Sequence, residues 1–383
     1  MKKSAYSLLK VLLLLLAPPL FCAAAPAGCA AGGRTAAPAE AAVPETDAAE
    51  TAPAVPETAA AETAPAAGDA APAEAVPAPE TAAPAPAGAS MRALVLNAGP
   101  RPGEPFAVAL ALPPEPGQEA AAPPQAILLD SGGRRSARAS FFSTGTDGAG
   151  TAIMAALLAV PSTMRGGKAA VRIEGLPPPG LEDIPVTIGD REFISETIDL
   201  DDLNTALRTE PDPQKTSEAE QLQMILRQTG TQIYTEGPFI PPVTSTRRTS
   251  FYGDRRIYRY TDGSTGNSIH AGVDYGVPTG TRVSACAPGR VVLARPRIVT
   301  GNSVVLEHLP GVYSLYYHLD SIAVREGDLV MAGTILGESG ATGLATGPHL
   351  HWEIRVAGEN TDPDALTARP LLDRNEIFVK LFE

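Results

Sequence analysis

The sequence predicts a mainly β protein in which two folded parts follow a long unfolded segment. Residues 91–200 carry short apolar runs separated by glycine and proline, whereas all five histidines lie among alternating apolar and polar stretches after residue 240. Residues 34–90 consist almost entirely of Ala, Pro, Glu and Thr. Short apolar runs between turn residues are typical of antiparallel sheets, and a segment with so few large apolar side chains cannot form a core.

The chain has 383 residues and a formal charge of −13, which excludes one class of partners. A nucleic-acid-binding protein needs a basic surface, so we expect no nucleic-acid partner. Of the three cysteines, Cys22 and Cys29 lie near the N-terminus, and only Cys286 lies in a part expected to fold. An intramolecular disulfide framework and a four-cysteine zinc site are therefore excluded there.

Residues 1–33 have the order of a secretory signal peptide. Lys2 and Lys3 come first, and a leucine-rich stretch follows from Leu8 to Leu16, interrupted only by Lys10 and Val11. Pro18 and Pro19 end it, and small residues continue to Gly33. The apolar stretch is shorter than the roughly 20 residues of a spanning helix. We therefore expect export to the cell envelope.

Two modes of signal processing fit the leader. Ala27-Gly28-Cys29 resembles the end of a bacterial lipoprotein signal, in which the cysteine is acylated and becomes the new N-terminus. Pro26 departs from that pattern, because leucine is usual there. The alternative is ordinary cleavage near Ala23-Ala24-Ala25, so the protein is expected either in the periplasm or on a membrane.

Residues 34–90 are expected to form a disordered tether. Val43–Ala54 and Val55–Ala66 are copies of one repeat that differ only at Asp47 and Ala59, and the segment has nine acidic residues against one basic residue. Proline and like charges should keep such a chain extended. It is predicted to be a spacer, although a compositional tail with no specific role is the alternative.

Residues 91–200 are predicted to form a β-sandwich of the immunoglobulin-like kind, because apolar runs recur there between breakers. No histidine or cysteine occurs in this range, and a structural role is expected. Residues 201–240 are predicted to be a helical connector, with a helix over Ser217–Gln228. The apolar runs are Ala93–Leu96, Phe106–Leu112, Ala126–Leu129, Ala137–Phe142, Ala152–Val160, Ala169–Ile173 and Ile184–Ile188.

The five histidines cluster between residues 270 and 351. His270 and Asp274 are four residues apart in a glycine-rich stretch that disfavours a helix, and in an extended segment they share a face. His349 and His351 share a face of a predicted strand, and His318 lies in another alternating strand. Imidazole and carboxylate side chains in such numbers predict a metal site with histidines left over for acid–base chemistry.

The stretch from Phe239 to Asp364 resembles the lysostaphin/LytM-type zinc endopeptidases of the bacterial cell wall. The resemblance implies a small, mainly antiparallel β domain with a narrow groove and one zinc ion. It implies that His270, Asp274 and His351 bind the zinc, and that His318 and His349 are catalytic without binding it. The matching segments are His270-Ala-Gly-Val-Asp274, Gly289-Arg-Val, Tyr317-His318-Leu319 and Gly347-Pro-His349-Leu-His351-Trp352.

The resemblance implies a zinc-dependent endopeptidase that hydrolyses peptide bonds in peptidoglycan during cell-wall remodelling. The alternative is a non-catalytic regulator of this fold that activates a separate wall amidase. Stem-peptide cross-links and interpeptide bridges both fit as substrates. The sequence departs from the Phe-Gly-x-Arg pattern of the family at Phe251-Tyr252-Gly253-Asp254-Arg255. The resemblance therefore does not predict the edge of the groove or the substrate preference.

We place the peptidase domain at residues 241–370 and a C-terminal tail at 371–383. Three residues of this part are predicted to pack in its core without taking part in chemistry. They are His308, Trp352 and Cys286.

Overall fold

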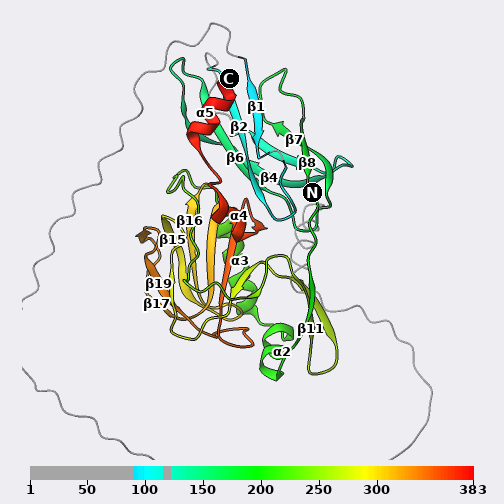
Figure 1. Cartoon of the computed structure of the whole chain (residues 1–383), viewed down its shortest axis with the longest axis vertical. Helices are drawn as coiled ribbons and strands as arrows, with labels where there is room; N and C mark the ends of the chain where they lie inside the picture. The colour runs from blue at the N-terminus through cyan, green and yellow to red at the C-terminus, as the bar shows by residue number, and fades with distance from the viewer. Residues whose placement is uncertain (1–89, 98, 115–121) are drawn as a thin grey trace, which may run out of the picture. The chain divides into compact units, whose positions relative to one another are not determined.

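The computed structural model describes residues 90–97, 99–114 and 122–383. The predicted leader with Cys29, and all but the last residue of the predicted tether, lie outside these residues. Figure 1 follows the described chain from its first strands in cyan to its last helix in red. Most of its regular structure is antiparallel β-sheet, so the predicted fold class is confirmed.

Residues 92–188 form two four-stranded antiparallel sheets with strand orders β1-β2-β6-β5 and β4-β3-β7-β8. Side chains from both sheets, among them Phe106, Leu128 and Val171, share one buried core, as expected for a β-sandwich. The strands are β1 (Arg92–Leu96), β2 (Pro105–Leu112), β3 (Gln125–Leu129), β4 (Arg135–Ser140), β5 (Phe142–Thr146), β6 (Ala152–Ala159), β7 (Gly167–Glu174) and β8 (Ile184–Ile188).

The predicted apolar runs coincide with strands, but the run Ala137–Phe142 is divided between the two sheets. β4 ends at Ser140 in one sheet, and β5 begins at Phe142 in the other. Phe141 and Phe142 are both buried, so apolar residues continue through the crossing. The apolar pattern therefore does not reveal where the chain changes sheets.

Two helices follow, α2 (Asp202–Thr209) and α3 (Pro213–Arg227). The predicted helix Ser217–Gln228 is confirmed as the larger part of α3. The helix begins earlier because the Asp212 side chain accepts hydrogen bonds from the first free backbone N–H groups, and proline is favourable in the first turn. Leu222 and Leu226 are buried, as their helical spacing predicts.

The histidines lie in and beside a ten-stranded sheet with the main order β10-β13-β20-β17-β16-β15-β18. β13 and β17 both pair with β20, so three segments that are distant in sequence meet at its centre. The strands are β10 (Arg248–Ser250), β13 (Gly272–Tyr275), β14 (Arg282–Ser284), β15 (Gly289–Arg297), β16 (Gly301–Leu309), β17 (Val312–Ile322), β18 (Leu329–Val330), β19 (Ile335–Ser339), β20 (Leu350–Val356) and β21 (Glu359–Thr361).

The three predicted core residues of this part are buried, which confirms the prediction. The Nδ1 atom of His308 lies 2.7 Å from the Pro288 carbonyl oxygen, and its Nε2 atom lies 2.7 Å from the Ser314 hydroxyl oxygen. Burial lowers the pKa of His308 to about 4, so its imidazole is neutral at neutral pH. Both ring nitrogens are thus occupied within the core.

A separate three-stranded sheet has the order β12-β11-β9. It contains β9 (Ser195–Asp199), β11 (Arg255–Arg259) and β12 (Thr265–Ile269), and β9 runs parallel to β11. These strands are polar on their exposed positions and carry no apolar run, which is why the sequence pattern did not indicate them. The sheet joins a strand before α2 to the hairpin that precedes His270.

The chain ends with α4 (Pro363–Ala368) and α5 (Arg374–Phe382). The range 371–383, which the sequence analysis treats as a tail, therefore contains a helix. Asp373 caps it, and Ile377 and Leu381 are buried. None of the described helices has the length and apolar character that crossing a membrane requires.

Candidate metal centre

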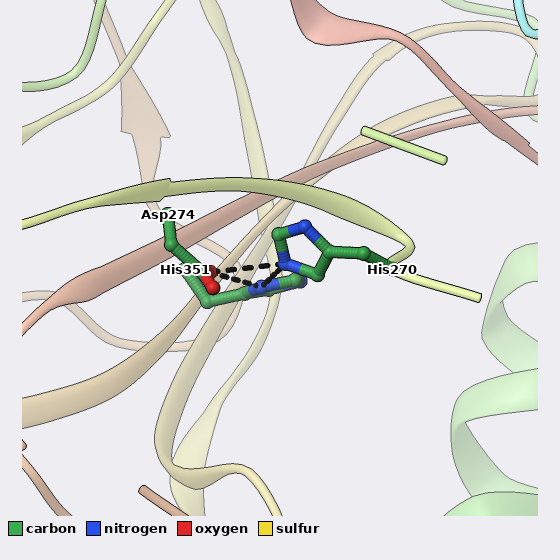
Figure 2. Close-up of side chains that lie close together, drawn as sticks. All are labelled: His270, Asp274 and His351. Carbon is green, nitrogen blue, oxygen red and sulfur yellow. Dashed lines mark hydrogen bonds and ion pairs between the residues drawn. The ribbon is translucent and has the colours of Figure 1, made fainter. Parts of the chain in front are cut away.

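His270, Asp274 and His351 point one donor atom each at a common point (Figure 2). Nε2 of His270 lies 3.1 Å from Oδ1 of Asp274 and 3.0 Å from Nδ1 of His351. Nδ1 of His351 lies 2.8 Å from the same Oδ1 atom. All three side chains are buried, and they form the one group of this kind among the residues that the structure describes.

The backbone fixes each of these side chains. Asp274 on β13 lies directly opposite His351 on β20 in the antiparallel ladder. His270 precedes β13, and its Nδ1–H donates to the Phe251 carbonyl over 2.7 Å, so the unprotonated Nε2 faces the cluster. Gly272 is required for this pairing, because a Cβ atom there would lie 2.1 Å from the backbone oxygen of Trp352.

The donor set fits a zinc ion. Two imidazole nitrogens and one carboxylate oxygen form a three-ligand set that leaves a fourth position open. Tetrahedral zinc with bonds near 2 Å places its ligand atoms about 3.3 Å apart, close to the separations found here. Burial opposes ionisation of Asp274, but the close contacts of its Oδ1 atom with the His270 and His351 rings outweigh burial and hold the pKa of this carboxyl well below its usual range.

His318 and His349 lie beside the cluster. Their ring centroids are 4.7 Å apart, and Nε2 of His349 lies 4.0 Å from Oδ1 of Asp274. Each ring donates its Nδ1–H to a backbone carbonyl over 2.8 Å, from His318 to Thr342 and from His349 to Gly347. In the neutral form of either ring, this hydrogen bond makes Nε2 the nitrogen that can accept a proton.

The backbone at His318 is in the left-handed region, with φ of 62°. Such a conformation is unfavourable for a residue with a branched or bulky side chain and is often found at functional sites. Burial, followed by the nearby His349 and His351 rings, lowers the pKa of His318 to about 3, so this imidazole is neutral at neutral pH. Its Nε2 atom is therefore available as a hydrogen-bond acceptor.

Residues 268–363 match the sequence profile described as peptidase family M23. The chain carries a peptidase family M23 domain. The expected resemblance to lysostaphin/LytM-type enzymes is thereby confirmed, since that group belongs to this family. The M23 domain includes all five predicted site residues.

Two curated relatives resemble this M23 domain. The DD-carboxypeptidase/endopeptidase Mpg of Neisseria meningitidis is 41% identical over 95 residues, which cover 25% of this chain and 22% of that protein. The peptidoglycan DD-endopeptidase ShyB of Vibrio cholerae is 40% identical over 99 residues, which cover 26% of this chain and 23% of that protein. The chain thus spans less than a quarter of the length of these relatives.

The solved structure of a putative peptidase M23 from Pseudomonas aeruginosa aligns over 70% of this chain and 94% of its own. Its TM-score is 0.46 and its sequence identity is 23%.

The structure brings together the five predicted site residues and keeps His308 apart in the core. It also adds neighbours that the sequence analysis did not name. Oε2 of Glu353 lies 3.6 Å from Nε2 of His351, and the Tyr317 ring stacks on the His351 ring with centroids 5.6 Å apart. Alternation along β20 was a usable signal for Glu353, because it lies two residues after His351.

Proposed function

We propose that this chain is a zinc-dependent endopeptidase that hydrolyses peptide bonds in peptidoglycan within the cell envelope. The observation that carries the proposal is the three-donor cluster of His270, Asp274 and His351 with two further imidazoles beside it. The M23 domain and its relatives named as peptidoglycan DD-endopeptidases support the reaction class and the substrate.

In this proposal His270, Asp274 and His351 hold zinc, and His318 and His349 handle protons. Zinc, when bound, supplies a Lewis acid that polarises a peptide carbonyl and lowers the pKa of water. In the neutral ring whose Nδ1–H donates to a backbone carbonyl, the Nε2 atom of His318 or His349 can accept a proton from the attacking water. Once protonated, the same nitrogen can donate a hydrogen bond to the former carbonyl oxygen, which becomes negatively charged when water attacks, or donate its proton to the departing amine.

The fixed Nδ1 hydrogen bonds are what make these two imidazoles suitable. The backbone carbonyls of Thr342 and Gly347 orient the two rings, so the position of each Nε2 atom is fixed before the reaction begins. The chain therefore supplies a preorganised pair beside the metal ligands.

The full chain, loaded with zinc, is expected to release cross-linked peptides from purified peptidoglycan as products that mass spectrometry identifies. A chelated sample is the control. Cleavage inside a cross-link would support an endopeptidase, whereas loss of a terminal residue alone would indicate a carboxypeptidase. A zinc-loaded chain that yields no product but stimulates an added wall amidase would favour the regulator instead.

We further propose that acylation of Cys29 anchors the protein to a membrane. Changing Cys29 to serine is expected to move the protein from the membrane fraction to the soluble fraction, because the acyl chains supply the anchor. Cys22→Ser is the matched control and should stay with the membrane. If the Cys29→Ser protein fractionates like the wild type, cleavage near Ala25 is the better interpretation.

A further inference from the structure

The two oxygens of the Asp274 carboxylate have different partners. Oδ1 faces His270 and His351, whereas Oδ2 lies 2.7 Å from Nη2 of Arg256. The Asp274 side chain is 8% exposed and the Arg256 side chain 14%, so this contact is largely shielded from water. A charge-assisted hydrogen bond in such a place is short and directional.

Arg256 is itself held by Glu196. These residues lie opposite each other in the parallel pair of β9 and β11, and Nε of Arg256 lies 2.9 Å from Oε1 of Glu196. The Ser250 hydroxyl donates to the same oxygen over 3.1 Å. The planar guanidinium is thus fixed between two carboxylates, with one edge toward Glu196 and one nitrogen toward Asp274.

Charge alone does not explain why an arginine lies here. A guanidinium beside a cation site repels the cation, which weakens its binding. Glu196 balances that charge, so Arg256 and Glu196 together add no net charge. What the pair does add is a fixed hydrogen bond to the carboxylate oxygen that faces away from His270 and His351.

We propose that Arg256 and Glu196 are positioning residues of the metal centre, holding Asp274 so that only Oδ1 is presented to the ion. The inference rests on the proposed metal site and goes beyond it, because both residues lie outside the family-matched range 268–363. Without Arg256, Oδ2 loses this hydrogen bond, and the Asp274 carboxylate is oriented only through the contacts of Oδ1. Partners of this outer kind commonly change metal affinity by about 10- to 100-fold.

The test compares zinc affinity and the visible spectrum of the cobalt(II)-substituted protein, with the full chain in every case. Arg256→Met is expected to weaken zinc binding by about 10- to 100-fold and to shift the cobalt bands, which report the coordination of the ion. If Arg256 acted through its charge alone, Arg256→Met should instead raise zinc affinity, since it removes a positive guanidinium near the zinc site. Tighter or unchanged binding with an unchanged spectrum would refute the proposal.

Two variants of Glu196 separate its hydrogen bond from its charge. Glu196→Ala and Glu196→Gln remove the same charge, but glutamine keeps an oxygen that accepts from Nε of Arg256. We expect glutamine to retain clearly more zinc affinity than alanine, and we expect Glu196→Ala to add little in the Arg256→Met background. Equal losses in the alanine and glutamine variants would contradict a positioning role.

The same two strands supply a matched control. Arg259 and Asp199 form an equivalent cross-strand pair with N and O atoms 3.0 Å apart, but both side chains are exposed. Arg259→Met and Asp199→Ala should leave zinc affinity and the cobalt spectrum unchanged, and a loss like that of Arg256→Met would overturn the inference. If circular dichroism shows that the Arg256→Met protein is unfolded, the comparison of Glu196→Ala with Glu196→Gln tests the positioning role by itself. A wild-type chain that binds no zinc would instead refute the metal site itself.

Discussion

Changing His351 to alanine is expected to strip the metal from the protein and abolish hydrolysis. His351 supplies one of only three donor atoms, so its loss leaves two ligands on the ion. The loss of affinity should exceed the roughly 10- to 100-fold that follows from removing an outer partner. The zinc-to-protein ratio after dialysis, measured by elemental analysis, checks this expectation.

His308→Gln is the matched control for His351→Ala. His308 is as deeply buried, but its ring contacts Pro288 and Ser314 and none of the three donor residues. This variant should lower stability, because it disturbs a buried hydrogen-bonded group, while keeping its zinc. Full zinc occupancy in His351→Ala would mean that another side chain completes the site. His349 is the nearest candidate, with Nε2 4.0 Å from Asp274, and the assigned roles would then be wrong.

Much of the fold follows from local patterns in the sequence. Apolar runs between glycine and proline marked the strands of the sandwich, because each run has to bury its side chains in one core. The same reasoning failed at Phe141, where the chain passes between sheets without becoming polar, and at β9, β11 and β12, which have no apolar run. Alternation and composition report burial, and burial alone does not distinguish one sheet from another.

The cluster of His270, Asp274 and His351, with His349 beside it, was predictable for a different reason. His270 and Asp274, and likewise His349 and His351, are close in sequence, so spacing along a strand places each pair on one face. The contact between Arg256 and Glu196 joins residues 60 positions apart through a parallel strand pair. No local pattern reports such a pairing, which is why the outer partners of the site emerge only from the structure.

His318 shows a further limit of local patterns. The alternating sequence around it predicted an extended strand, and β17 does include it, but its φ of 62° departs from extended geometry. Its backbone N–H donates to Thr300 and its ring to Thr342, so contacts from distant segments hold this conformation. Propensity argues against a left-handed histidine, and tertiary contacts override it.

Alanine at His318 or His349 is expected to leave zinc bound and to lower turnover by roughly two orders of magnitude or more. Neither side chain belongs to the three-donor cluster, so the metal content should match that of the wild type. Because the two imidazoles act on protons in the transition state, kcat should fall more than KM rises. Initial rates on soluble cross-linked peptides, together with elemental analysis, measure both quantities.

The left-handed backbone at His318 calls for a second variant there. Alanine is strained at that φ, whereas asparagine tolerates it and cannot act as a general base at neutral pH. His318→Asn therefore tests the imidazole with the backbone preserved, and it should lose turnover as His318→Ala does. If the His318→Asn protein keeps its activity, His318 is needed for the backbone conformation at this position and not for proton transfer.

Combining the two changes tests whether the imidazoles act as one unit. If His318 and His349 serve the same proton-transfer step, the double variant should lose about as much turnover as the more damaging single variant, because removing either disables the step. Independent roles would multiply the two losses. Near-normal hydrolysis by either single variant, with zinc retained, would contradict the assignment, since both rings lie beside the donor cluster with Nδ1 held by a backbone carbonyl.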